Sequence, residues 1–238
     1  MKKTLFSAAL VLTTIIAFGQ SGLLKKAGGL LKGGSGSSLS SDEVGNGLKE
    51  ALSIGVQKGS GQLSAANGFF GNAAVKILMP PDAQKVEKTL RGMGMGKQVD
   101  DAILAMNRAA EDAAKSAAPI FVDAIKQMSI QDAFGILKGG DTAATSYLRV
   151  KTTFPLTAAF KPVVDASLKK VDATKYWNTV TTAYNKVPFT KKVETDLTAY
   201  VTQRALSGMF YQVALEEAKI RTNPAAQTTE LLKKVFGK

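Results

Sequence analysis

The sequence predicts an all-α fold, a compact single-domain bundle of roughly nine helices with one short extended connector. Apolar residues recur every three or four positions along most of the chain, as on the buried face of a helix. Residues that start and stop helices flank these runs. Strand-like alternation of apolar and polar residues is confined to the stretch from Asn67 to Met79, and one such stretch cannot form a sheet.

Residues 1–19 have the pattern of a signal peptide. Lys2 and Lys3 precede an uncharged apolar run, and small residues stand just before Gln20. We expect cleavage before Gln20, a periplasmic or secreted bacterial protein, and no transmembrane segment after cleavage. Residues 20–38 form an arm rich in Gly, Ser, Lys and Leu. A flexible linker is expected there, although paired leucines and lysines would also suit a membrane surface or a groove.

The helical domain is expected over residues 39–238. Its first helix begins at a capping box, with Ser40 as the N-cap and a glutamate at the third helical position. This helix is expected to weaken through Gly59 and Gly61. The stretch from Asn67 to Met79 then forms the extended connector, which lies on the helices.

Two helices follow the connector. A short one starts near Asp82 and ends at the glycine cluster that begins with Gly92. A long alanine-rich helix runs from Val99 to Ala117, and its small side chains allow neighbouring helices to pack closely. Pro119 starts or kinks the next segment, because proline disrupts a helix interior.

A second capping signal is formed by Ser129 and Asp132, and the short helix after it ends at Gly139-Gly140. Asp141 is expected to cap the next helix. Further helices are expected over residues 142–151, 153–171, 176–188, 196–220 and 223–236.

The amino-acid composition excludes several kinds of chemistry. The chain contains no Cys and no His. Thiol nucleophiles, disulfides, Ser-His-Asp catalysis and the usual zinc ligand sets are therefore absent. Aspartate-rich calcium loops and the Glu-x-x-His pattern of di-iron bundles are also missing. We expect no metal and no cofactor.

The net charge of +12 is concentrated in one region. Between Arg149 and Lys192 the chain has nine basic residues and only two acidic ones. Aromatic residues are interspersed among them, so the region would suit an anionic surface. Amphipathic helices that turn lysines to water and aromatics to the core would produce the same pattern. The candidate patch comprises Arg149, Lys151, Lys161, Lys169, Lys170, Lys175, Lys186, Lys191 and Lys192.

Several blocks of sequence occur in one order along the chain: residues 106–111 (MNRAAE), 128–133 (MSIQDA), 139–145 (GGDTAAT), 188–189, 196–197, 200–201 and 228–236 (TTELLKKVF). Together they resemble a family of exported bacterial proteins catalogued as domain of unknown function number 4197. The resemblance extends from about Leu39 to the C-terminus. It implies an exported, helical, single-domain protein and brings no catalytic residue with it.

Gly139, Gly140, Asp141 and Thr142 form the motif most similar to a phosphate-binding turn. Glycines before a helix expose N–H groups that can bind an anion. Asp141 would occupy those donors itself, and the Lys-Ser/Thr pair of a Walker loop is missing. We therefore expect a helix-capping motif rather than an anion site.

A polar network is predicted between two helices. Asn107 and Glu111 share one helical face, while Arg108 is expected to pair with Asp112. Glu216, Glu217 and Arg221 lie near the end of the long helix, with Glu217 and Arg221 four residues apart. If the two helices meet, these side chains would either fix the helix register or line a polar pocket.

These patterns favour binding over catalysis. We expect a non-enzymatic exported protein that binds either an apolar ligand between helices or an anionic lipid or polymer of the envelope. One alternative is a carboxylate-dependent hydrolase of an envelope glycan, with Glu111 and Glu217 as acid and base. The other is a structural assembly partner. Nucleic acid is not expected as a partner, and the sequence does not determine the oligomeric state.

Overall fold

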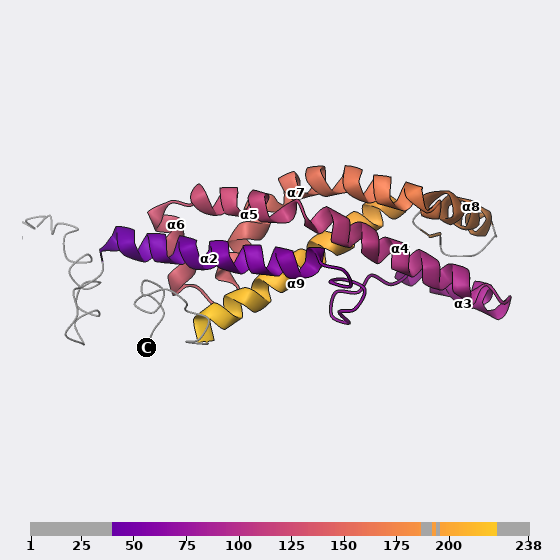
Figure 1. Ribbon diagram of the computed structural model, residues 1–238, viewed down its shortest axis with the longest axis horizontal. Helices are drawn as coiled ribbons and strands as arrows, with labels where there is room; N and C mark the ends of the chain where they lie inside the picture. Colours follow the sequence, from indigo (N-terminus) through magenta and orange to yellow (C-terminus); the bar gives the residue numbers. More distant parts are fainter. Residues whose placement is uncertain (1–39, 187–191, 194–195, 223–238) are drawn as a thin grey trace, which may run out of the picture. The chain divides into compact units, whose positions relative to one another are not determined.

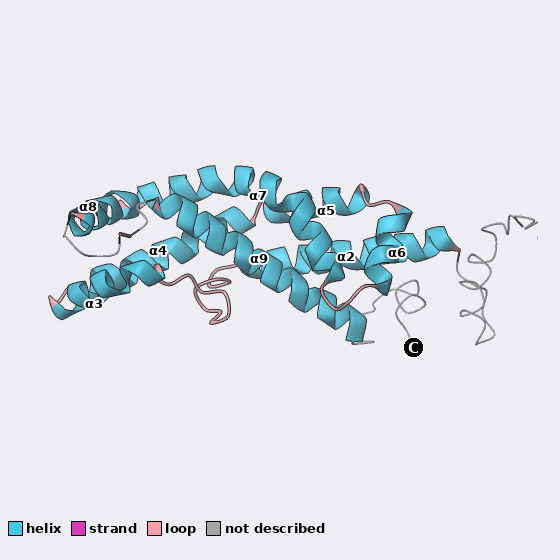
Figure 2. Cartoon of the chain, turned by 180° about the vertical axis from the view of Figure 1, so that it is seen from behind, coloured by secondary structure: helices cyan, strands magenta, loops and turns pink. Residues whose placement is uncertain are grey.

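The computed structural model describes residues 40–186, 192–193 and 196–222, and within these ranges it contains helices and loops but no strand (Figures 1 and 2). The predicted all-α class is confirmed. All described residues belong to one unit, Ser40–Lys238. The helices are α2 (Ser41–Ser64), the 3-10 helix η1 (Pro81–Ala83), α3 (Gln84–Gly92), α4 (Gly96–Ala114), α5 (Ala117–Lys126), α6 (Ile130–Lys138), α7 (Ala143–Lys170), α8 (Ala173–Asn185) and α9 (Leu197–Thr222).

These α-helices are fewer than the nine expected. One reason is that the expected helices 142–151 and 153–171 form the single helix α7, which contains Pro155 and Pro162. Both prolines face solvent, where water can bind the carbonyl groups that lose their helical partner. The buried stripe of α7 continues on both sides of them, from Leu148 through Leu156 to Leu168. The last expected helix, 223–236, lies outside the described residues.

Helix α2 starts as predicted but does not weaken at its glycines. Ser40 and Glu43 form the capping box, with Ser40 N–H donating to Glu43 Oε2 at 2.7 Å. Continuation through Gly59 to Ser64 follows from packing on α9. A Cβ at Gly59 would lie 3.1 Å from the side chain of Gln212, so glycine lets the two helices approach closely.

Helices α4, α7 and α9 pack against one another and form the centre of the core, with α2 and α5 beside them. In Figure 1, α9 crosses the other helices from the α8 end towards the α6 end. Four alanines in the second half of α4 are completely buried, which fits the prediction of close packing on small side chains: Ala109, Ala110, Ala113 and Ala114. Phe121 of α5 meets Phe210 of α9 edge-to-face at 5.8 Å between ring centroids.

The long alanine-rich helix ends earlier than expected. It was predicted to reach Ala117, but α4 stops at Ala114 and α5 starts at Ala117. Pro119 explains the break, because its ring would clash with the carbonyl group four residues earlier if the helix continued.

Between α2 and η1, the chain forms turns over residues 66–75 and then has no regular secondary structure up to Pro80. Val75, Ile77 and Met79 are buried, whereas Lys76 and Leu78 between them are not. The predicted alternation therefore holds for the second half of the connector, which lies on the core. The first half is more tightly folded than an extended segment.

Candidate functional site

Asn107, in the middle of α4, is completely buried and binds the connector. Its Oδ1 accepts a hydrogen bond from Ile77 N–H at 2.8 Å. Its Nδ2 donates to the carbonyl oxygens of Ile77, at 2.8 Å, and Ile103, at 2.7 Å. The Asn107 side chain thus satisfies both backbone polar groups of Ile77, as a neighbouring strand would do in a sheet.

Glu111, one helical turn later, holds the start of the same connector. Its Oε1 accepts hydrogen bonds from the N–H groups of Phe69 and Phe70, each at 3.1 Å. Its Oε2 pairs with Arg108, whose other guanidinium nitrogen donates to Asn67 Oδ1 at 2.9 Å. Asn107 and Glu111 therefore share a face as predicted, and their face is occupied by the connector.

The predicted partner of Arg108 was wrong. Asp112 pairs with Lys115 at 2.8 Å and accepts a hydrogen bond from Ser167 of α7 at 3.2 Å. Both hydrogen bonds lower the pKa of Asp112, and the bond from Lys115 has the larger effect. Arg108 binds Glu111 because Glu111 is nearly buried and would otherwise be an uncompensated charge.

Glu217 of α9 is also buried, and it caps α7. Its two carboxylate oxygens accept hydrogen bonds from the N–H groups of Ala144, at 3.0 Å, and Thr145, at 2.8 Å. The Thr145 hydroxyl donates to the same carboxylate at 2.8 Å. Arg221 donates to Glu217 at 2.9 Å and to the Ile136 carbonyl oxygen at 2.9 Å, so the two residues also connect α9 to α6.

This arrangement corrects the expected role of Asp141. The N-cap residue of α7 is Thr142, whose side chain makes no capping hydrogen bond, and Asp141 is exposed. The donors at the start of α7 are taken by Glu217 instead. Gly139 and Gly140 end α6 as expected, and a Cβ at Gly139 would lie only 2.6 Å from that of Ala143.

The two halves of the predicted network serve different segments. Helices α4 and α9 do pack together, but Glu111 binds the connector while Glu217 binds α7. Glu216 belongs to neither half and forms ion pairs with Lys58 of α2, at 3.4 Å, and Lys219 of α9, at 2.7 Å. A hollow beside Glu217 has a volume of only about 10 Å³, roughly the space of one water. Of the two alternatives, a shared polar pocket is therefore not supported, and the buried carboxylates instead hold neighbouring segments in place.

The basic patch divides into occupied and available cations. Arg149 lies over the buried ring of Phe210 at 4.4 Å, and Lys169 pairs with Asp165 at 2.7 Å. Lys161 makes no ion pair or hydrogen bond within the described part of the chain. Lys151 is exposed, with its Nζ 5.6 Å from the centre of the Tyr147 ring. Lys170, Lys186 and Lys192 are also exposed, whereas the Lys175 side chain and Lys191 lie outside the described residues.

The aromatic residues of this region separate in the same way. Phe160 and Trp177 are buried in the core. Phe154 is 84% exposed, and Val150, one turn earlier on the same face of α7, is 82% exposed. No acidic residue occurs in α7 before Asp165. Within α7 itself, this half therefore combines exposed apolar side chains with basic residues and no acidic ones.

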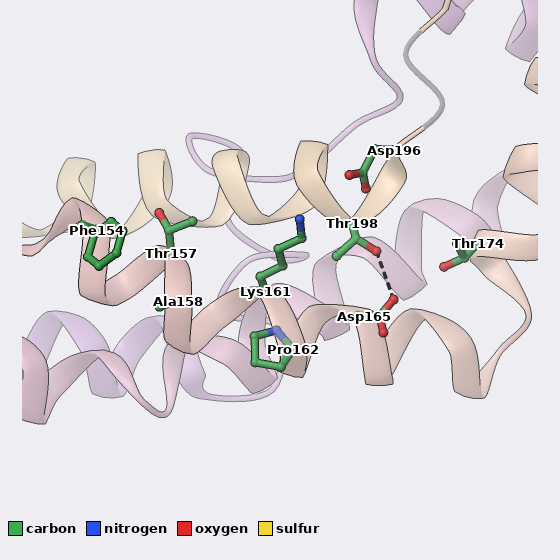
Figure 3. Close-up of a pocket in the computed structure, with 9 residues that line it drawn as sticks. All are labelled: Phe154, Thr157, Ala158, Lys161, Pro162, Asp165, Thr174, Asp196 and Thr198. Carbon is green, nitrogen blue, oxygen red and sulfur yellow. Dashed lines mark hydrogen bonds between the residues drawn. The ribbon is translucent and has the colours of Figure 1, made fainter.

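Beside this face lies an open groove of about 670 Å³ between α7, the start of α8 and the start of α9 (Figure 3). The Lys161 side chain extends from α7 towards α9, and the Thr174 hydroxyl points into the groove. That hydroxyl is buried and has no hydrogen-bond partner among the described residues. The described lining residues are Phe154, Thr157, Ala158, Lys161, Pro162, Asp165, Thr174, Asp196 and Thr198.

Two carboxylates line the groove. Asp165 Oδ1 accepts a long hydrogen bond, 3.5 Å, from the Thr198 hydroxyl (Figure 3). Asp196 caps α9 by accepting a bond from Ala199 N–H at 2.8 Å. The groove thus combines one cation, two carboxylates, several hydroxyls and an exposed aromatic ring.

With this geometry established, the sequence comparison gives the family. Residues 38–237 match the family described as protein of unknown function DUF4197. The chain belongs to this family. Searches among curated proteins and among solved structures gave no match.

The resemblance noted in the sequence is therefore confirmed, and the family supplies no activity. In the described ranges, no helix is both long and apolar enough to cross a membrane. The same residues contain no group of three or more His, Cys, Asp or Glu that could hold a metal ion.

The groove was missed in the sequence because three elements build it. Asp196, Thr198 and Thr174 carry no local pattern that would mark them as neighbours of Lys161. One part was detectable: Phe154 lies two residues from both Thr152 and Leu156 of the buried stripe. A helical residue in that position points away from the core.

Proposed function

We propose that this protein is a non-enzymatic binding protein of the bacterial envelope that uses α7 to bind anionic amphiphilic lipid surfaces. The exposure of Phe154 beside Val150, in an acid-free basic segment, carries the proposal. Large exposed apolar side chains are costly to leave in water, and they commonly mark a binding surface when they gather in one place.

Apolar burial and electrostatic attraction would both contribute to binding, with apolar burial the larger of the two. Burial of one side chain such as Phe or Val in lipid contributes about 1.5–3 kcal/mol. Each basic residue close to an anionic surface contributes about 1 kcal/mol. Phe154 and Val150 together with Lys151 and Lys161 would therefore support reversible binding, and neither the apolar pair nor the charges would suffice alone.

The other expectations receive less support from the geometry. A ligand between helices would need an apolar cavity, and the hollow beside Glu217 is too small for one. Glycan hydrolysis by Glu111 and Glu217 would need two available carboxylates on either side of a bond. Each of these carboxylates is already bound by backbone N–H groups and an arginine.

Sedimentation with lipid vesicles tests the proposal. The purified protein is expected to pellet with phosphatidylglycerol vesicles at low salt and less at moderate salt, because salt screens the attraction. Phe154→Ser should weaken this binding by about tenfold or more. Met93→Ser is the matched control, since Met93 is 69% exposed in the turn between α3 and α4. Absence of pelleting at low salt, or equal loss in both variants, would reject the proposal.

Export is part of the proposal and has its own test. The signal-peptide pattern of residues 1–19 predicts that the protein in the envelope fraction begins at Gln20. N-terminal sequencing of that material gives the answer directly. A protein that keeps Lys2 and Lys3 and remains in the cytosol would contradict the location. Capture of a stoichiometric envelope protein without any lipid binding would instead favour an assembly partner.

A further inference from the structure

Along α7, residues of three chemical types follow one another on the side that meets the groove. The apolar Phe154 comes first, with Val150 one turn before it and outside the groove lining, then the cation Lys161, and the carboxylate Asp165 last. With a rise of 1.5 Å per residue, Lys161 lies about 10 Å along the axis from Phe154 and about 6 Å from Asp165. This is the order of acyl chain, phosphate and ammonium in a phosphoethanolamine lipid.

The groups in the groove do not neutralise each other completely. Lys161 has no ion pair or hydrogen bond within the described part of the chain. The Thr174 hydroxyl points into the groove and is buried without a partner among the described residues (Figure 3). A buried polar group without a partner is unfavourable, so a ligand that supplies one would be stabilised there.

The charges of the groove select the class of ligand. Asp165, which also pairs with Lys169, and Asp196 would weaken the attraction of Lys161 for a simple anion. Lys161 would in turn weaken the attraction of the carboxylates for a simple cation. A zwitterion can satisfy both signs at once. The volume of about 670 Å³ is in the range of small-ligand sites.

We propose that this groove binds the headgroup of a phosphoethanolamine lipid, an inference that rests on the proposed function of α7. Lys161 binds the phosphate, Asp165 and Asp196 accept hydrogen bonds from the ammonium, and Thr174 supplies one more polar contact. The acyl region lies along Phe154 and Val150. A choline headgroup carries no N–H donor for the carboxylates, so the site distinguishes ethanolamine from choline.

Vesicles of phosphatidylcholine, with and without phosphatidylethanolamine, provide the test, because both surfaces are net neutral. The protein is expected to bind the ethanolamine-containing vesicles about tenfold more tightly, the effect of one or two charge-assisted hydrogen bonds. The double variant Asp165→Asn, Asp196→Asn should abolish this preference. Asparagine is as good an N-cap as aspartate, so α9 keeps its cap. Lys161→Gln should weaken binding to both ethanolamine-containing and phosphatidylglycerol vesicles.

Asp101→Asn is the matched control. Asp101 pairs with a lysine four residues away, Lys97, just as Asp165 pairs with Lys169. It should leave the preference unchanged. A preference that survives the double variant would reflect lipid packing and would overturn the inference. Binding of soluble glycerophosphoethanolamine as tight as that of vesicles would contradict the lipid assignment.

The two proposals fail in different ways. Salt-sensitive binding to phosphatidylglycerol that requires Phe154, without any preference for ethanolamine over choline, would reject the headgroup site and leave the proposed function standing. Failure to bind any vesicle would reject both.

Discussion

Two regions of this molecule use the same kinds of side chain for different ends. In the interior, Glu111 and Glu217 accept hydrogen bonds from backbone N–H groups, and each pairs with an arginine. In the α7 groove, Lys161 has no partner in the described part of the chain and the Thr174 hydroxyl is buried without one. The interior carboxylates are fully engaged, whereas the groove keeps capacity for a ligand.

The comparison shows why burial of a charged residue is a poor guide to function on its own. Glu217 is only 3% exposed, and its burial has a structural explanation. The first four N–H groups of any helix have no partner within that helix, and Glu217 accepts hydrogen bonds from two of them in α7. Phe154 is 84% exposed, and no contact among the described residues explains why a phenylalanine stands there. Function is more reasonably sought where the fold leaves a side chain unexplained.

The largest expected effect comes from removal of the interior carboxylate that caps α7. Glu217→Ala should lower the free energy of unfolding by about 3–5 kcal/mol, because it leaves two buried N–H groups without their acceptor and the half-buried Arg221 without its carboxylate. Urea unfolding followed by circular dichroism measures this change. Asp141→Ala is the control and should change stability by less than about 0.5 kcal/mol, because Asp141 is exposed and makes no cap. Equal losses in the two variants would contradict the assignment of the cap.

The connector provides the next test of the interior region. Asn107→Ala should cost about 2–3 kcal/mol, because the N–H and carbonyl groups of Ile77 lose their partners. Hydrogen exchange should show faster exchange of the Ile77 amide, with little change in α6, to which Asn107 makes no hydrogen bond. Uniform acceleration over the whole protein would mean that Asn107 supports the core in general and not the connector in particular.

The sequence predicted most interactions within one element, although it gave Arg108 the wrong partner on its own helix. The capping boxes at Ser40 and Ser129 and the Glu217–Arg221 pair were all predicted, since their partners lie three or four residues apart. The all-α class follows from the same local periodicity. These features depend on helix geometry alone, and helix geometry is known before the fold is.

Interactions between elements could not be predicted. Glu217 and the amide groups that it caps are more than 70 residues apart in sequence. The prediction that Asp141 caps α7 was locally reasonable and wrong, because a carboxylate from another helix reaches the site. The glycines of α2 were misinterpreted for the same reason. Gly59 weakens an isolated helix, but in the fold it allows close contact with α9.

A pair of phenylalanines on one helix sharpens the contrast between the two regions. Phe160→Ala should lower the free energy of unfolding by about 3–5 kcal/mol, since Phe160 is fully buried. Phe154→Ala, six residues earlier on α7, should change it by no more than about 0.5 kcal/mol. Thermal unfolding of both variants is the measurement. A large loss for Phe154→Ala would show that its ring supports the fold, and the proposed lipid-binding role would lose its main argument.

The smallest expected effect is a pH dependence at the start of α6. Hydrogen bonds from the Ser129 hydroxyl, and then from its backbone N–H, lower the pKa of Asp132 below its usual value of about 3.9. A carboxyl group whose pKa is lower in the folded state stabilises the fold above its unfolded-state pKa, and this contribution is lost as the pH falls through the folded-state value. Asp132→Asn should therefore lower the melting temperature slightly at neutral pH, and the difference from the parent protein should shrink as the pH falls below about 3.9 and through the folded-state pKa. Melting curves recorded from neutral pH down to about pH 2 would show the convergence. A constant difference over this range would mean that the ionised form of Asp132 is not what stabilises the cap.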